Sequence, residues 1–177
     1  MHSLKYTFFG LLIAITLFFL WALSLPSVLH VQQSKTYQSD VDVLFAELSD
    51  FHKWIDWFPW MDEGMQFEIV NAKATPGHKL SWTHPEQGSG YIEIFSIEKP
   101  TEIEQNLQFN ESSEVLKSDF RLIEKQTGGT EIVWTISNDE KYPYPLGRVR
   151  AFVIRKMSEK NMQQALDDIP FHLEISD

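Results

Sequence analysis

A run of apolar residues close to the N-terminus constrains this chain more than any other feature of its sequence. Between Tyr6 and Leu25 there is no charged residue, and Phe, Leu, Ile and Trp fill most positions. As a helix, about 20 residues span about 30 Å, the thickness of the hydrocarbon core of a bilayer. Tyr6 and Trp21 fall near the two ends, where aromatic side chains favour the membrane interface. Pro26 then ends the helix.

Three interpretations of this run are open. A helix that spans a membrane fits its length. A cleaved signal peptide is the second, because Ala22-Leu23-Ser24 resembles a small-x-small cleavage site, although the run exceeds the usual length of about 7–15 residues. A buried core helix is the third, and it needs a larger protein to cover all its faces. We predict a transmembrane anchor over residues 6–25.

The charges that flank the run predict its orientation. Lys5 precedes it, the nearest cation after it is Lys35, and Asp40 and Asp42 follow. The positive-inside rule therefore places the N-terminus in the cytoplasm and the rest of the chain outside, which in a bacterium is the periplasm. The expected localisation is a cell membrane that the chain crosses once.

Charge and composition limit the partners of the remaining chain. The net charge of −10 argues against nucleic acid and against electrostatic adhesion to anionic lipid. The absence of cysteine excludes a disulfide framework, a thiol nucleophile and a cysteine metal site. With 43% apolar residues the chain can form a packed core. We expect one domain over residues 28–170 and a short tail over residues 171–177.

Alternation of apolar and polar residues predicts an antiparallel sheet with one covered face. Gly128-Gly129 is typical of a hairpin turn. Two short helices are expected after the first strand, the second of them capped by Asp50 and ended by Pro59. The predicted strands cover residues 28–37, 65–70, 78–84, 91–97, 102–109, 115–125 and 130–137.

A long helix is predicted from Leu146 to about Ile169, and we expect it to lie across the sheet. Its predicted inward stripe has helical spacing: it contains Leu146, Val149, Phe152, Val153 and Met157 and resumes at Ala165, Leu166 and Ile169. Ser158 and Asn161 interrupt the stripe, and Asn161 is expected to face a cavity. In the alternative, the helix is rotated slightly, Asn161 points to solvent and Met162 takes the inward position. One helix cannot fill the concave face of a curved sheet, so a cavity is expected.

Three motifs and the order of the elements resemble a known superfamily. They are Asp50-Phe51-x-x-Trp54-x-x-Trp57-x-Pro59-Trp60, Gly88-x-Gly90-x-Ile92-x-Ile94 and Thr130-x-Ile132-x-Trp134-Thr135. Together they resemble the START-like helix-grip superfamily, in the polyketide cyclase/dehydrase-like SRPBCC branch, many of whose bacterial members carry one N-terminal membrane segment. The resemblance implies an α+β fold, in which a curved antiparallel sheet wraps around the long C-terminal helix, and a ligand-binding cavity.

The expected function is the binding of a hydrophobic or amphipathic small molecule, lipid-like or polyketide-like, in that cavity. A protein-interaction module whose cavity is filled by side chains is the rival interpretation, and a polyketide cyclase-like enzyme ranks third. No cofactor is expected. The residues predicted to line the cavity are Trp82, Ile94, Leu107, Phe109, Trp134, Phe152, Met157 and Asn161.

No catalytic or metal-ligating residue is predicted. His78 and His84 share a predicted strand six residues apart, about 20 Å along a strand, which is too far for one metal ion. His30, His52 and His172 are scattered along the chain. His84 is the best placed of the histidines, because it ends a strand beside the expected cavity rim.

Two further groups of side chains have alternative interpretations. Trp54, Trp57 and Trp60 recur every third residue; we expect them to attach the short helices to the sheet, with a cavity lid or contact with the bilayer surface as alternatives. A basic cluster on the long helix is expected to be a solvated face with some ion pairs, and contact with an acidic head group is the alternative. It consists of Arg148, Arg150, Arg155, Lys156 and Lys160.

Overall fold

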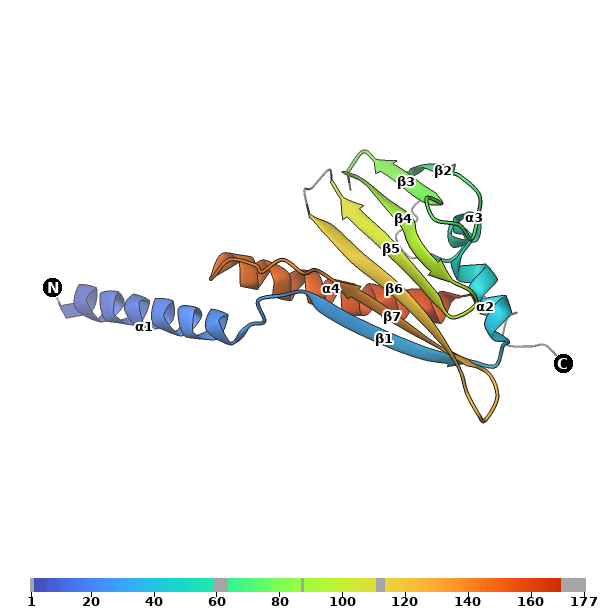
Figure 1. Cartoon of the computed structure of the whole chain (residues 1–177). Helices are drawn as coiled ribbons and strands as arrows, with labels where there is room; N and C mark the ends of the chain where they lie inside the picture. The colour runs from blue at the N-terminus through green and yellow to red at the C-terminus, as the bar shows by residue number, and fades with distance from the viewer. Residues whose placement is uncertain (1, 59–63, 87, 111–113, 170–177) are drawn as a thin grey trace.

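A long N-terminal helix leads into an antiparallel sheet, and a second long helix closes the fold (Figure 1). The computed structural model describes residues 2–58, 64–86, 88–110 and 114–169. Its elements are α1 (His2–Ser24), β1 (His30–Tyr37), α2 (Val41–Leu48), α3 (Phe51–Trp54), β2 (Gln66–Val70), β3 (Lys79–His84), β4 (Gly88–Glu98), β5 (Glu102–Phe109), β6 (Val115–Glu124), β7 (Thr130–Ser137) and α4 (Leu146–Asp168).

The seven strands form one sheet in the order β1-β7-β6-β5-β4-β3-β2, and all neighbouring strands are antiparallel. The sheet curves around α4, while α2 and α3 lie at the end of the domain far from α1 (Figure 1). A register shift between Ile94 and Ser96 bends β4. The predicted fold class, a curved antiparallel sheet with a long C-terminal helix and an apolar N-terminal helix, is confirmed.

Alternation along the strands builds the core as predicted. On β7, Ile132, Trp134 and Ile136 are buried, and the residues between them are half-buried. On β6, Leu116 and Phe120 face the same side. The inward faces of neighbouring strands meet α2, α3 and α4 in one apolar cluster. Removal of this apolar surface from water is the main favourable term in folding.

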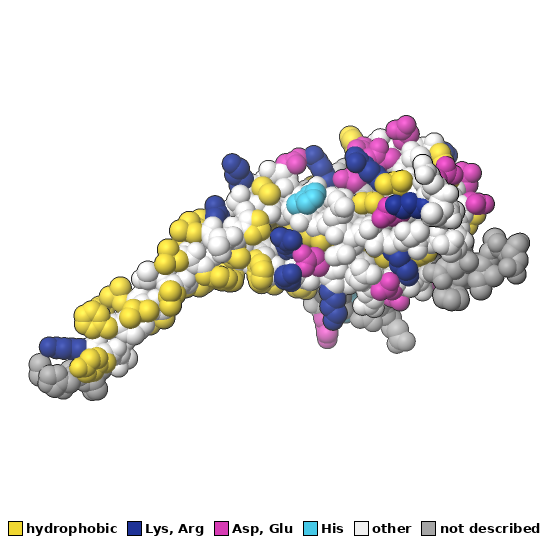
Figure 2. Space-filling view, turned by 90° about the horizontal axis from the view of Figure 1, so that it is seen from below, with side chains coloured by type: hydrophobic (Ala, Val, Ile, Leu, Met, Phe, Trp, Pro, Cys, Tyr) yellow, Lys and Arg dark blue, Asp and Glu magenta, His cyan; other side chains and the backbone are white. Residues whose placement is uncertain are grey.

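The surface of α1 is apolar and exposed. All described side chains from Lys5 to Leu20 are exposed, which excludes the buried-core-helix interpretation. Figure 2 shows hydrophobic side chains along the length of α1, outside the folded domain. The stretch Lys5–Ser24 is long and apolar enough to cross a membrane. By length and composition it is compatible with a membrane anchor or a signal sequence.

The predicted inward stripe of α4 is confirmed where it resumes near the helix end, at Ala165, Leu166 and Ile169, but it is wrong at three positions of its first part. Val153 and Met157 are 49% and 60% exposed, and Leu146 at the helix start is also exposed. Val149 and Phe152 are half-buried. The apolar residues in this part of α4 therefore do not form the contact between the helix and the core.

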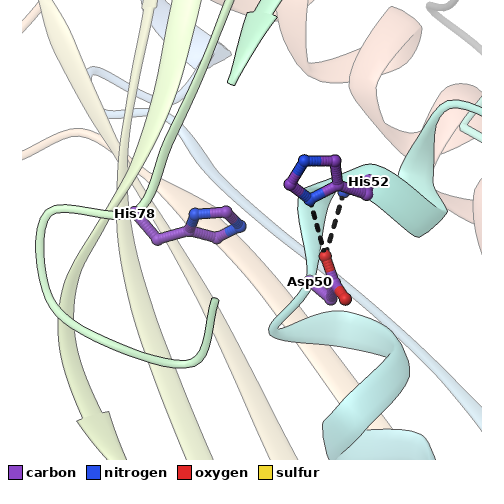
Figure 3. Close-up of side chains that lie close together, drawn as sticks. All are labelled: Asp50, His52 and His78. Carbon is purple, nitrogen blue, oxygen red and sulfur yellow. Dashed lines mark hydrogen bonds and ion pairs between the residues drawn. The ribbon is translucent and has the colours of Figure 1, made fainter. Parts of the chain in front are cut away.

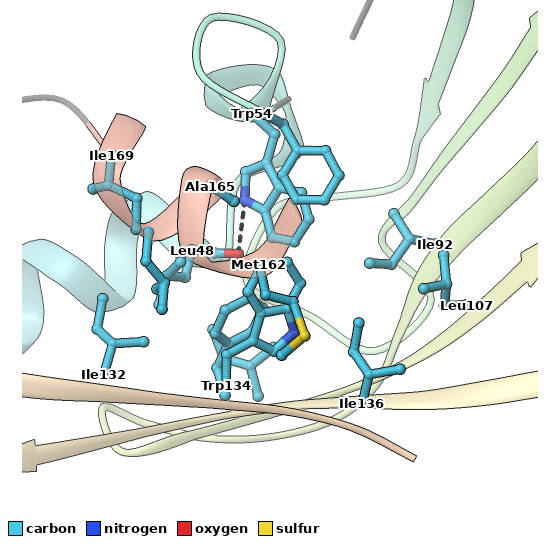
Figure 4. Packing of buried hydrophobic residues seen from close by; sticks show 14 of the residues in the cluster. Leu48, Trp54, Ile92, Leu107, Ile132, Trp134, Ile136, Met162, Ala165 and Ile169 are labelled. Atoms are coloured by element: carbon cyan, nitrogen blue, oxygen red, sulfur yellow. Dashed lines mark hydrogen bonds between the residues drawn. The ribbon is translucent and has the colours of Figure 1, made fainter. Parts of the chain in front are cut away.

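Four buried residues at helical spacing form that contact, and the two nearest the helix end belong to the predicted stripe. Figure 4 shows Met162 beside the ring of Trp134, so Met162 takes the inward position and Asn161 is only half-buried. The half-buried Arg155 and Ser158 lie on the same face. These two polar residues interrupt the apolar pattern, so the sequence does not show that this face is inward. Arg155 can lie there because its long stem covers apolar surface. The buried residues of α4 are Ala151, Met162, Ala165 and Leu166.

The tryptophans after α2 attach the short helices to the core, as expected for Trp54 and Trp57. Trp54 is fully buried, donates a hydrogen bond to the carbonyl of Leu48 over 3.2 Å, and meets Phe120 of β6 edge to face. Trp57 is buried and donates to the Glu47 carboxylate over 3.2 Å. Trp60 and the tail over residues 171–177 lie outside the described residues.

Candidate ligand-binding site

A cavity of about 380 Å³ lies between the sheet and the first half of α4. Strands β5, β6 and β7 supply one wall, and α4 supplies the other. Most of the lining is apolar, and the ends of β5 and β6 that contribute to it point toward the α1 end of the domain (Figure 1). The lining residues are Leu107, Phe109, Asn110, Glu114, Leu116, Ile136, Tyr142, Arg150, Ile154, Met157 and Ser158.

The polar side of the cavity is organised around one carboxylate. The hydroxyl of Tyr142 donates to Glu114 Oε1, and Asn138 Nδ2 donates to the same oxygen over 2.6 Å. Burial, followed by the hydrogen bond to Glu114, raises the pKa of Tyr142 above its ordinary value, so the phenol stays protonated. The guanidinium of Arg150 lies 3.5 Å from Glu114 Oε2 and is largely exposed. This side of the cavity therefore offers a cation beside a hydrogen-bonded carboxylate.

A second polar group lies one row deeper in the sheet. Gln105 and Ser118 are directly paired across β5 and β6, and Ser118 is paired with the cavity residue Ile136. Trp134 Nε1 donates to Ser118 Oγ over 3.0 Å, and Ser118 Oγ donates to Gln105 Oε1 over 3.2 Å. Gln105 is 1% exposed, and its Nε2 has no hydrogen-bond partner among the described residues.

The amide nitrogen of Gln105, which is unpaired within the described residues, destabilises the folded state. If the amide were turned over, its oxygen would lack a partner instead, so either orientation leaves one polar atom unsatisfied. A buried polar atom without a partner costs about 1–3 kcal/mol. Gln105 lies between Ile103 and Leu107 on the inward face of β5. Leu107 lines the cavity, so the N–H donors of Gln105 Nε2 lie one inward position away from the cavity wall.

The structure brings three of the predicted cavity residues together. Leu107 and Phe109, both on β5, lie in the sheet wall of the cavity, and Met157 lies in its α4 wall. Trp82 is beside this group, because its ring meets the edge of Phe109 at a centroid distance of 5.7 Å. Trp82 itself does not line the cavity in the described part of the chain.

The other predicted cavity residues lie elsewhere. Ile94 and Trp134 are completely or almost completely buried in the core, and Trp134 stacks on Phe120 at 4.9 Å. Phe152 packs against Trp21 of α1 at 6.1 Å. Asn161 is half-buried beyond the cavity. All four predictions are corrected. Trp134 and Asn161 are outside the cavity because it lies over the first half of α4, whereas the core closes over the second half. Phe152 is in the first half of α4 but contacts α1 instead.

Sequence reasoning missed Glu114 and Tyr142 in the lining of the cavity, and it also missed the buried amide of Gln105. Glu114 and Tyr142 are in connecting segments, where neither a helical nor a strand period predicts the direction of a side chain. Gln105 did carry a signal, because strict alternation on β5 places it inward between Ile103 and Leu107.

Two histidines that are distant in sequence meet at α3. Figure 3 shows Asp50, His52 and His78 close together, and their ligand atoms all lie within 4.8 Å of one another. His78 directly precedes β3, the strand that His84 ends, and it is fully buried. His52 was expected to be isolated and instead contacts Asp50 through Nδ1 at 3.1 Å.

The contacts of this cluster indicate a structural role and not a metal site. The Nδ1 atom of His78 lies 3.2 Å from the carbonyls of Val70 and Asn71, and its Nε2 accepts from the Phe51 N–H over 3.2 Å. Both ring nitrogens are thus engaged with backbone, which leaves no lone pair for a metal ion. Lys73 lies 3.2 Å from Asp50 and compensates its charge. The cluster fastens the start of α3 to the loop before β3.

The pH dependence of stability tests this role. Burial favours a raised pKa for Asp50, but hydrogen bonds from His52 and Lys73 outweigh it and hold the pKa below 3.8. A lowered folded-state pKa means that the carboxylate stabilises the protein above about pH 4, and that this contribution disappears as the pH falls through the folded-state pKa. Asp50→Asn should therefore cost about 1 kcal/mol at pH 7, and this cost should shrink as the pH falls through the folded-state pKa.

Urea denaturation between pH 7 and pH 2 checks this prediction. Asp56→Asn, at an exposed position just after α3, serves as the matched control and should show little effect at any pH. A stability difference for Asp50→Asn that stays constant over the whole range would contradict the assignment.

Comparisons with known proteins bear on the fold alone. No family model matches the sequence, and no curated protein matches it. Solved structures do match. A protein of unknown function from Staphylococcus aureus is 13% identical with a TM-score of 0.61, over 82% of this chain and 93% of that chain. A protein from Mycobacterium smegmatis is 14% identical with a TM-score of 0.60, over 86% of this chain and 99% of that chain. This chain shares the fold of these two solved structures.

A third match is the Aha1 dimer from Colwellia psychrerythraea. It is 13% identical with a TM-score of 0.59, over 83% of this chain and 97% of that chain. At such identities the similarity concerns architecture, because one fold carries many unrelated activities. The matches are consistent with a helix-grip fold, and the function has to be argued from the cavity.

Proposed function

We propose that this protein is a membrane-anchored member of the START-like helix-grip superfamily, in the SRPBCC branch, that binds an amphipathic small molecule with an apolar chain. The observation that carries the proposal is the cavity between β5–β7 and α4, with apolar walls and a few polar groups. Its volume of about 380 Å³ falls within the range of about 300–1,000 Å³ that is typical of small-molecule sites. Isolated polar groups in an apolar pocket orient a ligand that has one polar end.

The polar groups suggest how the ligand is oriented. Among the described residues, the ion pair of Arg150 is a 3.5 Å contact with Glu114, and its largely exposed guanidinium can turn toward an anionic or hydrogen-bond-accepting head group. Tyr142 and Asn138 keep Glu114 satisfied, which limits repulsion between its carboxylate and such a head group. The apolar chain then extends along Leu107, Leu116 and Ile136 toward the row of Gln105 and Ser118.

The contacts of α1 favour an anchor over a cleaved signal peptide. The hydroxyl of Tyr144 donates to the carbonyl of Phe19 over 2.9 Å, and Arg148 donates to the carbonyl of Leu23 over 3.0 Å. A signal peptide is removed from the mature protein, and such a cut would discard these contacts with the start of α4. These contacts support a domain that stays beside the membrane, and the positive-inside rule at Lys5 favours a position outside the cytoplasm.

Filling the cavity tests the binding function. Ile154→Trp places a ring into the cavity from α4, so we expect it to lower the amount of bound amphiphile at least tenfold while the protein stays folded. Val153→Trp is the matched control, because Val153 is the neighbouring residue on the same helix and is exposed. The measurements are native mass spectrometry of the gently extracted full-length protein and titration with a fluorescent single-chain fatty acid.

The outcomes separate the proposal from its rivals. Bound amphiphile in the wild type and in Val153→Trp, but not in Ile154→Trp, supports binding in the cavity. A wild-type protein that retains no small molecule and does not bind the fatty acid favours the protein-interaction module. Equal occupancy in the two tryptophan variants would place the ligand somewhere other than this cavity.

A further inference from the structure

The start of α4 exposes large apolar side chains next to the end of α1. We define the α4 tip as Tyr144, Pro145 and Leu146. Leu146 is 72% exposed and Tyr144 is 40% exposed. Gly147 keeps the tip compact, because a Cβ at this position would lie 2.6 Å from Cδ of Pro143. The tip is thus a well-packed turn that carries an uncovered leucine.

Four contacts hold the tip and the first turns of α4 against α1. Tyr144 donates to the Phe19 carbonyl over 2.9 Å, and their rings lie 6.1 Å apart. Arg148 donates to the carbonyls of Leu23 and Leu25 over 3.0 and 3.4 Å. Carbonyl groups at a helix C-terminus lack helical partners and carry partial negative charge, so this guanidinium caps α1. The packing of Trp21 on Phe152, at 6.1 Å between centroids, completes the contact.

These contacts set the depth of the tip relative to the membrane. The apolar span ends at Ser24, and Tyr144 contacts Phe19, which lies five residues, or about 7.5 Å, inside that end at a helical rise of 1.5 Å per residue. Helices that lie on membranes bury their apolar side chains about 5–10 Å into the boundary between head groups and acyl chains. The hydroxyl of Tyr144 reaches a comparable depth along α1.

The surroundings of the tip match such a boundary. The exposed cations Lys141 and Arg150 flank it in the sequence, and Figure 2 shows dark blue side chains where the apolar surface of α1 meets the folded domain. Tyr and Arg side chains present an apolar body and a polar end, which suits the head-group level. The Nε of Arg148 is buried without a partner among the described residues, and a lipid oxygen or water at this level can accept its hydrogen bond.

We propose that the α4 tip is a second membrane contact, which inserts into the leaflet where α1 ends and holds the cavity at the lipid boundary. The cavity residues Arg150 and Met157 follow Leu146 by four and eleven residues, or about 6 and 16 Å along the helix axis. A lipid of that leaflet therefore reaches the cavity without crossing bulk water, which names membrane lipid as the source of the ligand. This inference rests on the anchored, ligand-binding function proposed above.

Spin labels on single cysteines test the depth of the tip. The chain has no cysteine of its own, so Leu146→Cys carries one nitroxide in the full-length protein reconstituted into phosphatidylcholine–phosphatidylglycerol vesicles. We expect this label to be accessible to oxygen and shielded several-fold from a water-soluble nickel chelate. Val153→Cys, seven residues further along α4, should be more accessible to nickel. Phe95→Cys, at an exposed position on β4, is the aqueous control, and Leu12→Cys in α1 is the lipid control.

The controls separate the two ways in which the idea can fail. A Leu12 label that is accessible to nickel refutes the anchor itself. A Leu12 label in lipid, together with a Leu146 label as accessible to nickel as Phe95, leaves the anchor intact and overturns the membrane contact of the tip.

Transfer of a fluorescent fatty acid from vesicles to the reconstituted protein tests the route. Leu146→Asp should slow this transfer several-fold and leave the affinity measured in detergent unchanged, because Leu146 does not line the cavity. Phe95→Asp should change neither quantity. An unchanged transfer rate in Leu146→Asp would overturn the proposed route from the leaflet.

Discussion

Removal of residues 1–26 should transfer the protein completely from the membrane pellet to the soluble fraction. The folded domain begins immediately afterwards, because the Tyr142 N–H bonds to the Ser27 carbonyl over 2.7 Å and the Asn138 N–H bonds to the Leu29 carbonyl over 3.0 Å. The full-length protein should stay in the pellet at high salt and in carbonate, because apolar attachment is insensitive to ionic screening. Fractionation followed by immunodetection measures both results.

A length-matched variant strengthens this test. Leu12→Lys combined with Leu17→Lys keeps the length of α1 but places two charges in the apolar span. Each charge costs about 2.5–3.5 kcal/mol at the centre of a membrane helix. It should also leave the pellet. Mature protein from cells that lacks residues 1–24 would instead establish the signal-peptide interpretation.

Trp134→Ala should cost about 3–5 kcal/mol of unfolding free energy, the range for deleting a large buried ring. Trp134 is 1% exposed, stacks on Phe120 at 4.9 Å and meets Phe58 at 6.1 Å. Its Nε1 also donates to Ser118 Oγ, which in turn donates to Gln105. A loss of this size is a large fraction of the total stability of about 5–15 kcal/mol for a domain. Urea denaturation of the soluble domain measures it.

Trp134→Phe is the matched control for that loss. It keeps an aromatic ring in the stack and removes the donor to Ser118, so we expect a smaller cost, about 1–3 kcal/mol. The lining of the cavity stays intact, because Trp134 is not part of it, so fatty acid binding should persist in this variant. A cost below about 1 kcal/mol for Trp134→Ala would contradict its place in the core.

Local periodicity explains how much of the fold the sequence predicts. Strand β7 was predicted with its observed bounds, Thr130–Ser137, because alternation there is unbroken. The start of β1 was predicted two residues early, at Val28, because an apolar residue at a strand end looks the same whether or not it is paired. Asp50 was predicted as an N-cap and accepts from the His52 N–H, because capping depends on a few neighbouring residues.

The candidate site was harder to predict because it depends on contacts between distant segments. Leu107 and Phe109 were placed correctly in the cavity wall, since both follow the alternation of β5. Tyr142 and Glu114 meet across connecting segments that have no period of their own. Met157 lines the cavity although it is not part of the buried core. A helical stripe predicts which residues share a face, but it does not separate cavity residues from core residues.

The sequence by itself determined the elements that repeat with a local period: the apolar α1, the inward and outward faces of the strands, and the existence of a long C-terminal helix. The rotation of α4 was decided only in the tertiary structure, because Phe152 has a partner in α1 and Met162 has one in the sheet. The pairing of Asp50 and His52 with His78 depends on the loop before β3 folding back onto α3. A period records which face of an element is apolar, whereas the partner of that face depends on every other element that competes for the same surface.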